Sequence, residues 1–159
     1  MKKQILFVCL GNICRSPAAE GVFLNLLKQK GLEDQFIVDS AGTGGWHVGH
    51  KADERMRNAA LKRGINIESL ARQITLNDLE SFDLILTMDS DNLSAINSLA
   101  KDANLNVYQK IRPILSYGKT TKLMEVPDPY YGGINGFEKV LDLLEESCNG
   151  LLEYLILQE

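Results

Sequence analysis

The feature that most constrains this chain is a short turn that joins a wholly apolar run to the start of a helix. Residues 4–9, QILFVC, are continuously apolar, which is typical of a strand buried on both faces of a parallel sheet. The turn GNICR follows, and Ser16-Pro17 then predicts a helix start with Ser16 as the N-cap. A strand, a tight turn and a helix in immediate succession predict an α/β fold.

The alternation of strands and helices continues along the rest of the chain. Further strands are predicted at 36–39, 82–88 and 106–111, and helices at 16–30, 52–63, 90–100 and 137–155. Between them lie a glycine-rich loop at 41–50 and a stretch without periodicity at 112–129. We therefore predict one domain over residues 1–159: a four-stranded parallel sheet, doubly wound and flavodoxin-like, with helices on both faces. In such folds ligands bind at the carboxyl ends of the strands.

Composition excludes several classes of function. The chain has 159 residues, of which 45% are hydrophobic and 24% charged, as in ordinary globular domains. A net charge of −4 without a block of Lys or Arg disfavours nucleic acid. With no membrane-spanning apolar run and no signal peptide, we expect no membrane partner and a cytoplasmic location. Three cysteines form no disulfide framework, and the pair His47 and His50 lacks a third ligand, so we expect no metal site and no cofactor.

The turn after the first strand carries the chemistry. Backbone N–H groups at a helix N-terminus form an anion-binding nest, and Gly11 and Asn12 are residue types that readily take the positive φ of such a turn. These amides also favour the thiolate of Cys9. Arg15 can hold two phosphate oxygens, and Ser16 can donate its hydroxyl to the sulfur. A thiolate, an oxyanion cradle and a guanidinium together suit nucleophilic attack on phosphorus.

The segment CLGNICRSP at residues 9–17 resembles the signature of low-molecular-weight protein tyrosine phosphatases. Further similar segments follow in the family's order over nearly the whole chain: DSAGT at 39–43, WHVG at 46–49, ARQ at 71–73, MD at 88–89 and DPYY at 128–131. The resemblance implies that Cys9 is the nucleophile, Arg15 the phosphate ligand and Asp128 the general acid. The expected phosphate-binding residues around them are Leu10, Gly11, Asn12, Ile13, Cys14 and Ser16.

The implied reaction is hydrolysis of phosphotyrosine monoesters through a phosphocysteine intermediate, with phosphotyrosine-containing proteins as partners. One carboxyl group can protonate the leaving phenolate and then activate the water. Asp128 suits both steps because Pro127 and Pro129 restrict the backbone on either side of it. We expect this stiff arm to need little loop closure when substrate binds.

Aromatic residues near these segments are candidates for a wall around the substrate ring. They are Trp46, Tyr130 and Tyr131. Two forms of regulation stay open on sequence alone. One is a reversible disulfide between Cys9 and Cys14, which lie in one short loop. The other, which the resemblance to the family implies, is phosphorylation of the paired tyrosines.

Three further residues, Ser69, Asp89 and Ser90, bear on the groups that support the turn. Several family members are expected to carry a histidine where Ser69 stands and an acidic residue where Ser90 stands. These departures affect a supporting hydrogen-bond network rather than the core chemistry. Asp89 either orients Arg15 or caps the helix predicted to begin at residue 90, and we favour the cap.

Other functions compete with this interpretation. A protein-arginine phosphatase of the same family tends to carry Thr where Ile13 stands and less aromatic bulk at residues 130–131. A thioredoxin-coupled arsenate reductase needs two more cysteines, which residues 70–100 lack. A non-catalytic phosphoprotein-binding module would not need Cys9 or Asp128, and a flavin-binding electron carrier of similar topology would be yellow. A weak homodimer also stays open.

Overall fold

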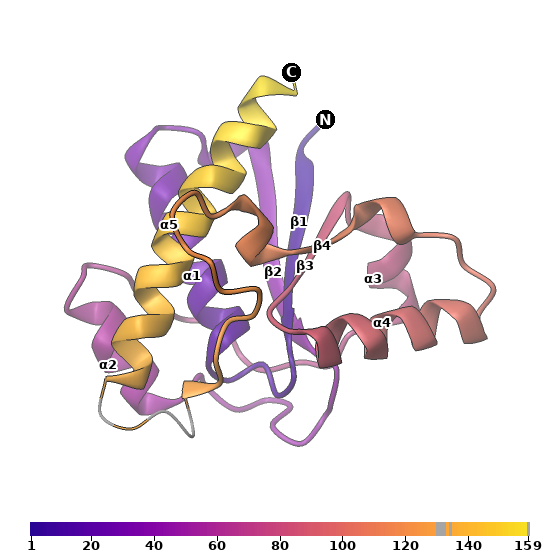
Figure 1. Ribbon diagram of the computed structural model, residues 1–159, viewed down its shortest axis with the longest axis horizontal. Coiled ribbons are helices and arrows are strands. Elements are labelled where there is room, and N and C mark those ends of the chain that lie inside the picture. Colours follow the sequence, from indigo (N-terminus) through magenta and orange to yellow (C-terminus); the bar gives the residue numbers. More distant parts are fainter. Residues whose placement is uncertain (130–132, 134, 159) are drawn as a thin grey trace.

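A four-stranded, wholly parallel sheet forms the centre of the computed structural model, which describes residues 1–129, 133 and 135–158 (Figure 1). Its strands are β1 (Lys3–Cys9), β2 (Phe36–Gly42), β3 (Leu84–Thr87) and β4 (Ile111–Pro113). Their order is β2-β1-β3-β4, so β1 is central and pairs with β2 and β3. The predicted fold class is confirmed.

Helices cover both faces of this sheet (Figure 1). On one face lie α1 (Arg15–Gln29), α2 (Glu54–Leu61) and α5 (Gly136–Leu157), and on the other lie α3 (Leu76–Ser81) and α4 (Ser90–Asp102). Short 3₁₀ turns are η1 (Glu33–Gln35), η2 (Tyr108–Lys110) and η3 (Ile114–Tyr117). Within the described ranges, no helix is both long and apolar enough to cross a bilayer.

Strand β1 joins two separate hydrophobic cores. Ile5 and Phe7 face α1, α2 and α5, whereas Leu6 and Val8 face α3 and α4, and all four side chains are fully buried. This explains why the strand is apolar at every position. Packing on both faces fixes the strand and therefore the position of Cys9 at its carboxyl end.

Two predicted elements are corrected by the structure. The strand predicted at 106–111 was wrong except for its last residue, because 108–110 form η2 and β4 begins only at Ile111. Helix α3 was not predicted. Its signal is a capping box, in which Thr75 and Asp78 each bind the other's backbone N–H. A six-residue helix shows too little apolar periodicity to be found otherwise.

The predicted N-cap of the first helix was also wrong. Helix α1 begins at Arg15 with Cys14 as the N-cap, and no side chain caps it. Ser16 lies inside the first turn because its hydroxyl is engaged with the Cys9 sulfur at 3.0 Å. The first amides of α1 thus lack a side-chain partner, which leaves this helix end suited to an anion.

Close packing between α5 and η3 generates a stability prediction. A Cβ at Gly150 would overlap the carbonyl oxygen of Tyr117. Gly150→Ala should therefore destabilise the fold by about 1–3 kcal/mol, although alanine normally favours a helix over glycine. Denaturant unfolding measures this free energy. As a control, Asn149→Ala, at the exposed neighbouring residue, should change it by less than about 0.5 kcal/mol. A more stable Gly150→Ala protein would contradict the packing described.

Candidate active site

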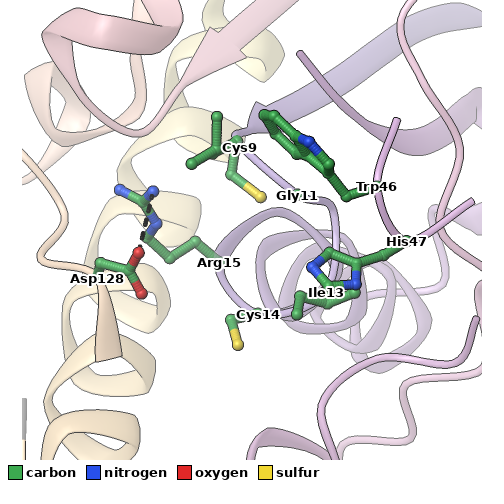
Figure 2. Close-up of a pocket in the computed structure, with 9 residues that line it drawn as sticks. Cys9, Gly11, Ile13, Cys14, Arg15, Trp46, His47 and Asp128 are labelled. Atoms are coloured by element: carbon green, nitrogen blue, oxygen red, sulfur yellow. Dashed lines mark ion pairs between the residues drawn. The ribbon is translucent and has the colours of Figure 1, made fainter. Parts of the chain in front are cut away.

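A small pocket opens where β1 ends and α1 begins (Figure 2). Its volume is about 230 Å³. This is below the ~300–1,000 Å³ usual for ligand pockets, so it suits a compact group better than an extended cofactor. The lining residues are Cys9, Leu10, Gly11, Ile13, Cys14, Arg15, Trp46, His47 and Asp128.

The two cysteines of the pocket differ in their chemistry. The Cys9 sulfur lies 3.0 Å from the Ser16 hydroxyl and accepts a hydrogen bond from the Asn12 backbone N–H at 3.2 Å. Donors to sulfur stabilise a thiolate. By contrast, burial raises the pKa of Cys14 to about 12, and the nearby charge of Asp53 adds to this effect. Cys14 therefore stays a protonated thiol at neutral pH, and Cys9 is the candidate nucleophile.

The side chain of Asn12 holds the turn together. Asn12 has a φ of 57°, which confirms the positive φ expected for it. Its Nδ2 donates to Ser16 Oγ at 2.7 Å and to Ser40 Oγ at 3.0 Å, while its Oδ1 accepts from the Arg72 backbone N–H at 2.9 Å. Ser16 Oγ accepts from Asn12 and has one proton of its own, for which the Cys9 sulfur at 3.0 Å and the Ala41 carbonyl oxygen at 3.4 Å are the acceptors within reach.

Glycine is needed in this turn for space rather than for conformation. The positive φ expected for Gly11 was wrong, since Asn12 alone in the turn takes it. A Cβ at Gly11 would lie 3.0 Å from the His47 ring. A Cβ at Gly42, across from the turn on β2, would lie 2.8 Å from the Leu10 carbonyl oxygen and 3.1 Å from the Asn12 nitrogen. The turn thus packs directly on the end of β2.

Arg15 is buried and held by groups from distant parts of the chain. Its Nη1 donates to Asp89 Oδ2 at 2.6 Å and to the Val126 carbonyl at 3.1 Å, and its Nη2 lies 4.0 Å from Asp128 Oδ2. Asp89 also caps α4, because its other oxygen accepts from the Asn92 N–H at 2.8 Å. The expected cap is thus confirmed, and the same carboxylate orients Arg15 as well.

Asp128 lies beside Arg15 at the mouth of the pocket (Figure 2). Its side chain is 37% exposed, so it reaches both the pocket and water. The segment before it is anchored twice at Val126, whose N–H donates to the Met88 carbonyl at 2.8 Å and whose carbonyl accepts from Arg15. These anchors add to the stiffness that Pro127 and Pro129 give the arm.

Trp46 and His47 form the wall opposite Arg15 (Figure 2). Trp46 is 70% exposed, and its ring lies so close to Gly44 that a side chain there would overlap it. Sequence reasoning assigned His47 no role in the site, since its pairing with His50 as metal ligands was set aside for want of a third ligand. Its place next to Trp46 was the signal that it lines the site. Tyr130 and Tyr131 lie outside the described residues. Within those described, no three His, Cys, Asp or Glu side chains gather closely enough to hold a metal ion.

The structure separates the residues expected to bind phosphate into two groups. Leu10, Gly11, Ile13 and Cys14 line the pocket. Asn12 and Ser16 are buried behind it and bind the Cys9 sulfur instead of facing the cavity.

A second cavity, of about 450 Å³, lies on the other side of Arg15. Its lining includes four carboxylates, those of Asp89, Asp91, Glu125 and Asp128. This density of negative charge repels an anion. A phosphate group is therefore directed to the pocket that contains Cys9.

Comparison with known proteins identifies the family. The sequence profile described as low molecular weight phosphotyrosine protein phosphatase matches residues 4–159. The chain belongs to this family. Its members are cysteine-based phosphomonoesterases, and the resemblance expected from CLGNICRSP is confirmed.

Relatives of this phosphatase chain match it over almost their whole length. YfkJ of Bacillus subtilis, a low molecular weight protein-tyrosine-phosphatase, is 44% identical over 150 residues, which cover 94% of this chain and 93% of YfkJ. The crystal structure of YfkJ superposes with a TM-score of 0.92 at 41% identity, covering 100% of this chain and 98% of that one. A Drosophila arginine phosphatase superposes with a TM-score of 0.88 at 33% identity, covering 98% of both chains.

The double role of Asp89 can be separated by two substitutions. Asp89→Asn keeps an acceptor for the Asn92 N–H but removes the charge that faces Arg15, so kcat/KM for para-nitrophenyl phosphate should fall by about 10-fold to 100-fold with little change in stability. Asp89→Ala should lose activity similarly and also about 0.5–2 kcal/mol of stability. Steady-state kinetics and denaturation measure both effects. Full activity in Asp89→Asn would show that the ion pair does not orient Arg15.

Proposed function

We propose that this protein hydrolyses phosphotyrosine monoesters in proteins through a phosphocysteine intermediate. Cys9 is the nucleophile, Arg15 the phosphate ligand, and Asp128 the general acid and then the general base. The observation that carries the proposal is the convergence of these three side chains on one small pocket at the uncapped end of α1. Family membership supports the same chemistry.

In the first step the Cys9 thiolate attacks phosphorus. An S–P bond forms, the bond from phosphorus to the phenolic oxygen breaks, and Asp128 gives its proton to that oxygen. Arg15 and the first amides of α1 stabilise the negative charge on the phosphoryl oxygens. Both are in place before substrate arrives, because Arg15 is held by Asp89 and Val126.

In the second step water hydrolyses the intermediate. The Asp128 carboxylate removes a proton from water, the new O–P bond forms, and the P–S bond breaks to release inorganic phosphate. The electron pair returns to the Cys9 sulfur, where the Ser16 hydroxyl and the Asn12 N–H stabilise it. Asp128 ends protonated and ready for the next cycle.

Substrate choice is set by the apolar part of the pocket. The Ile13 side chain and the exposed face of Trp46 offer carbon surface to a phenyl ring. A phosphoarginine side chain would bring polar N–H groups against the same surface without hydrogen-bond partners there. The similarity to an arginine phosphatase keeps that activity as the second candidate.

The setting of the protein follows from its nucleophile. A catalytic thiolate must stay reduced, and Cys14 lies in the same turn, which favours the reducing cytoplasm. Phosphotyrosine-containing proteins are the proposed partners.

Substitutions at Cys9 and Asp128 test the mechanism, in assays that contain EDTA to remove metal ions. Cys9→Ser should abolish turnover of para-nitrophenyl phosphate. Asp128→Asn should lower kcat by about 10²–10⁴ for phenyl phosphate, whose leaving group needs a proton, and by much less for the better para-nitrophenolate leaving group. A Cys9→Ser protein that still turns over would overturn the mechanism, and equal losses on both substrates would remove Asp128 as the acid.

Position 13 tests the choice of substrate. The wild type should prefer phosphotyrosine over phosphoarginine in the same peptide, and Ile13→Thr should shift the ratio of kcat/KM values by about tenfold towards phosphoarginine, because it places a hydroxyl against the substrate. Ile37→Thr, the same exchange on an exposed residue of β2, should leave the ratio unchanged. A wild-type preference for phosphoarginine would favour the second candidate instead.

A further inference from the structure

The loop that follows β2 contains two adjacent glycines, Gly44 and Gly45, beside the pocket. Neither has a positive φ, so the backbone conformation would allow a side chain at both positions. At Gly44, however, a Cβ would lie 1.9 Å from Cζ3, 2.4 Å from Cε3 and 2.5 Å from Cη2 of Trp46. The six-membered ring of the indole therefore occupies the space that a side chain at residue 44 would need.

The backbone beneath this ring is bonded to the catalytic turn. The Thr43 N–H donates to the Cys9 carbonyl and the Gly44 N–H donates to the Leu10 carbonyl, both at 2.9 Å. These bonds continue the parallel pairing of β1 and β2 beyond the strand ends. The backbone of Gly44 cannot move away from the indole without breaking them. A side chain at residue 44 would therefore displace the exposed Trp46 ring and leave the turn in place.

Contact with Gly44 limits where the indole can lie. Trp46 is 70% exposed, so the rest of the protein covers only a minor part of its surface. An exposed side chain of this size can otherwise take several rotamers. In the structure the ring reaches across the Gly11 side of the pocket towards Cys9 (Figure 2). The absence of a side chain at residue 44 thus keeps the flat indole close to the loop and beside the mouth of the pocket.

We propose that Gly44 is a positioning residue, whose missing side chain allows Trp46 to form a preorganised wall against the aromatic ring of the substrate. The inference rests on the proposed function, since it concerns the leaving group of an aryl phosphate. A wall that is already in place loses little rotamer freedom when substrate binds. Gly44 therefore acts on the binding of aryl phosphates through Trp46, and does not touch the phosphate group that Cys9 and Arg15 bind.

The first test compares two substrates in the Gly44→Ala protein. Phenyl phosphate has a ring to lie against Trp46, whereas acetyl phosphate has a good leaving group and no ring. Gly44→Ala should raise KM for phenyl phosphate roughly threefold to tenfold, with kcat within about twofold of the wild type. Its KM and kcat for acetyl phosphate should stay at the wild-type values.

Gly45→Ala is the matched control for this substitution. A Cβ at Gly45 would lie 2.8 Å from Oε1 of Gln73, the far end of a flexible and exposed side chain, and not against the indole. Gln73 can therefore yield while Trp46 stays in place. Gly45→Ala should match the wild type on both substrates.

Fluorescence reports the indole directly, because Trp46 is the only tryptophan of the chain. Time-resolved anisotropy should show a larger fast component in Gly44→Ala than in the wild type or Gly45→Ala, since the displaced ring moves more freely. A general effect on folding would not single out this ring. The readout also needs no turnover. If the wild type did not hydrolyse phenyl phosphate, the proposed function would fail, and the anisotropy would still test whether Gly44 positions Trp46.

A double substitution tests whether the kinetic effect passes through Trp46. Trp46→Ala should raise KM for phenyl phosphate, and adding Gly44→Ala to it should change KM no further. Three outcomes would overturn the proposal: wild-type KM for phenyl phosphate or wild-type anisotropy in Gly44→Ala, equal losses on both substrates, or a further loss when Gly44→Ala is added to Trp46→Ala. The last outcome would show that the added methyl group distorts the backbone of the turn instead of moving the ring.

Discussion

The left-handed backbone of Asn12 is the constraint on which the catalytic turn depends. This conformation costs a residue with a side chain about 1–2 kcal/mol, so the turn needs compensation from elsewhere. Hydrogen bonds to Ser16, Ser40 and the backbone of Arg72 supply it. These partners come from α1, β2 and the loop before α3. The conformation of the turn is therefore a property of the assembled sheet and not of the motif alone.

The burial of the charged Arg15 side chain likewise depends on contacts with distant parts of the chain. A buried guanidinium is tolerated only when its donors are satisfied, and here Nη1 is bound by Asp89 and by the Val126 carbonyl. Asp89 is the N-cap of α4, two residues after β3 ends, and Val126 is in the arm that leads to Asp128. Arg15 thus links the residue that caps α4 to the arm that carries Asp128, and its Nη2 lies 4.0 Å from Asp128 Oδ2 at the pocket that both residues line.

The features that could be predicted from the sequence are those that show as a pattern within one short segment. The apolar run of β1 and the turn after it are contiguous, so one short segment was enough to predict the fold class and to suggest roles for Cys9 and Arg15. The short edge strand β4 has only three residues and leaves almost no pattern, which is why its predicted position was wrong. Ser16 was misassigned because a serine before a proline has the local features of an N-cap, whereas its partner, the Cys9 sulfur, is set by the turn.

Contacts between distant segments could not be predicted in this way. Asn12 and Arg72 are 60 residues apart, and Arg15 and Asp89 are 74 apart, so no motif contains both partners. The hydrogen bond from Asn12 to Ser40 likewise joins residues that are 28 apart, one in the turn and one on β2.

The pocket is built on a rigid scaffold. Strand β1 is packed between two cores, the turn is held by its side-chain network, and Asp128, the proposed acid, lies on an arm restricted by two prolines. Dipoles fixed before substrate binds stabilise developing charge without the cost of reorganisation. Buried polar groups are the cost of that arrangement, and the apolar cores on both faces of the sheet offset it. Loosening these hydrogen bonds would relieve the buried polar groups and, for the same reason, let the Cys9 sulfur move.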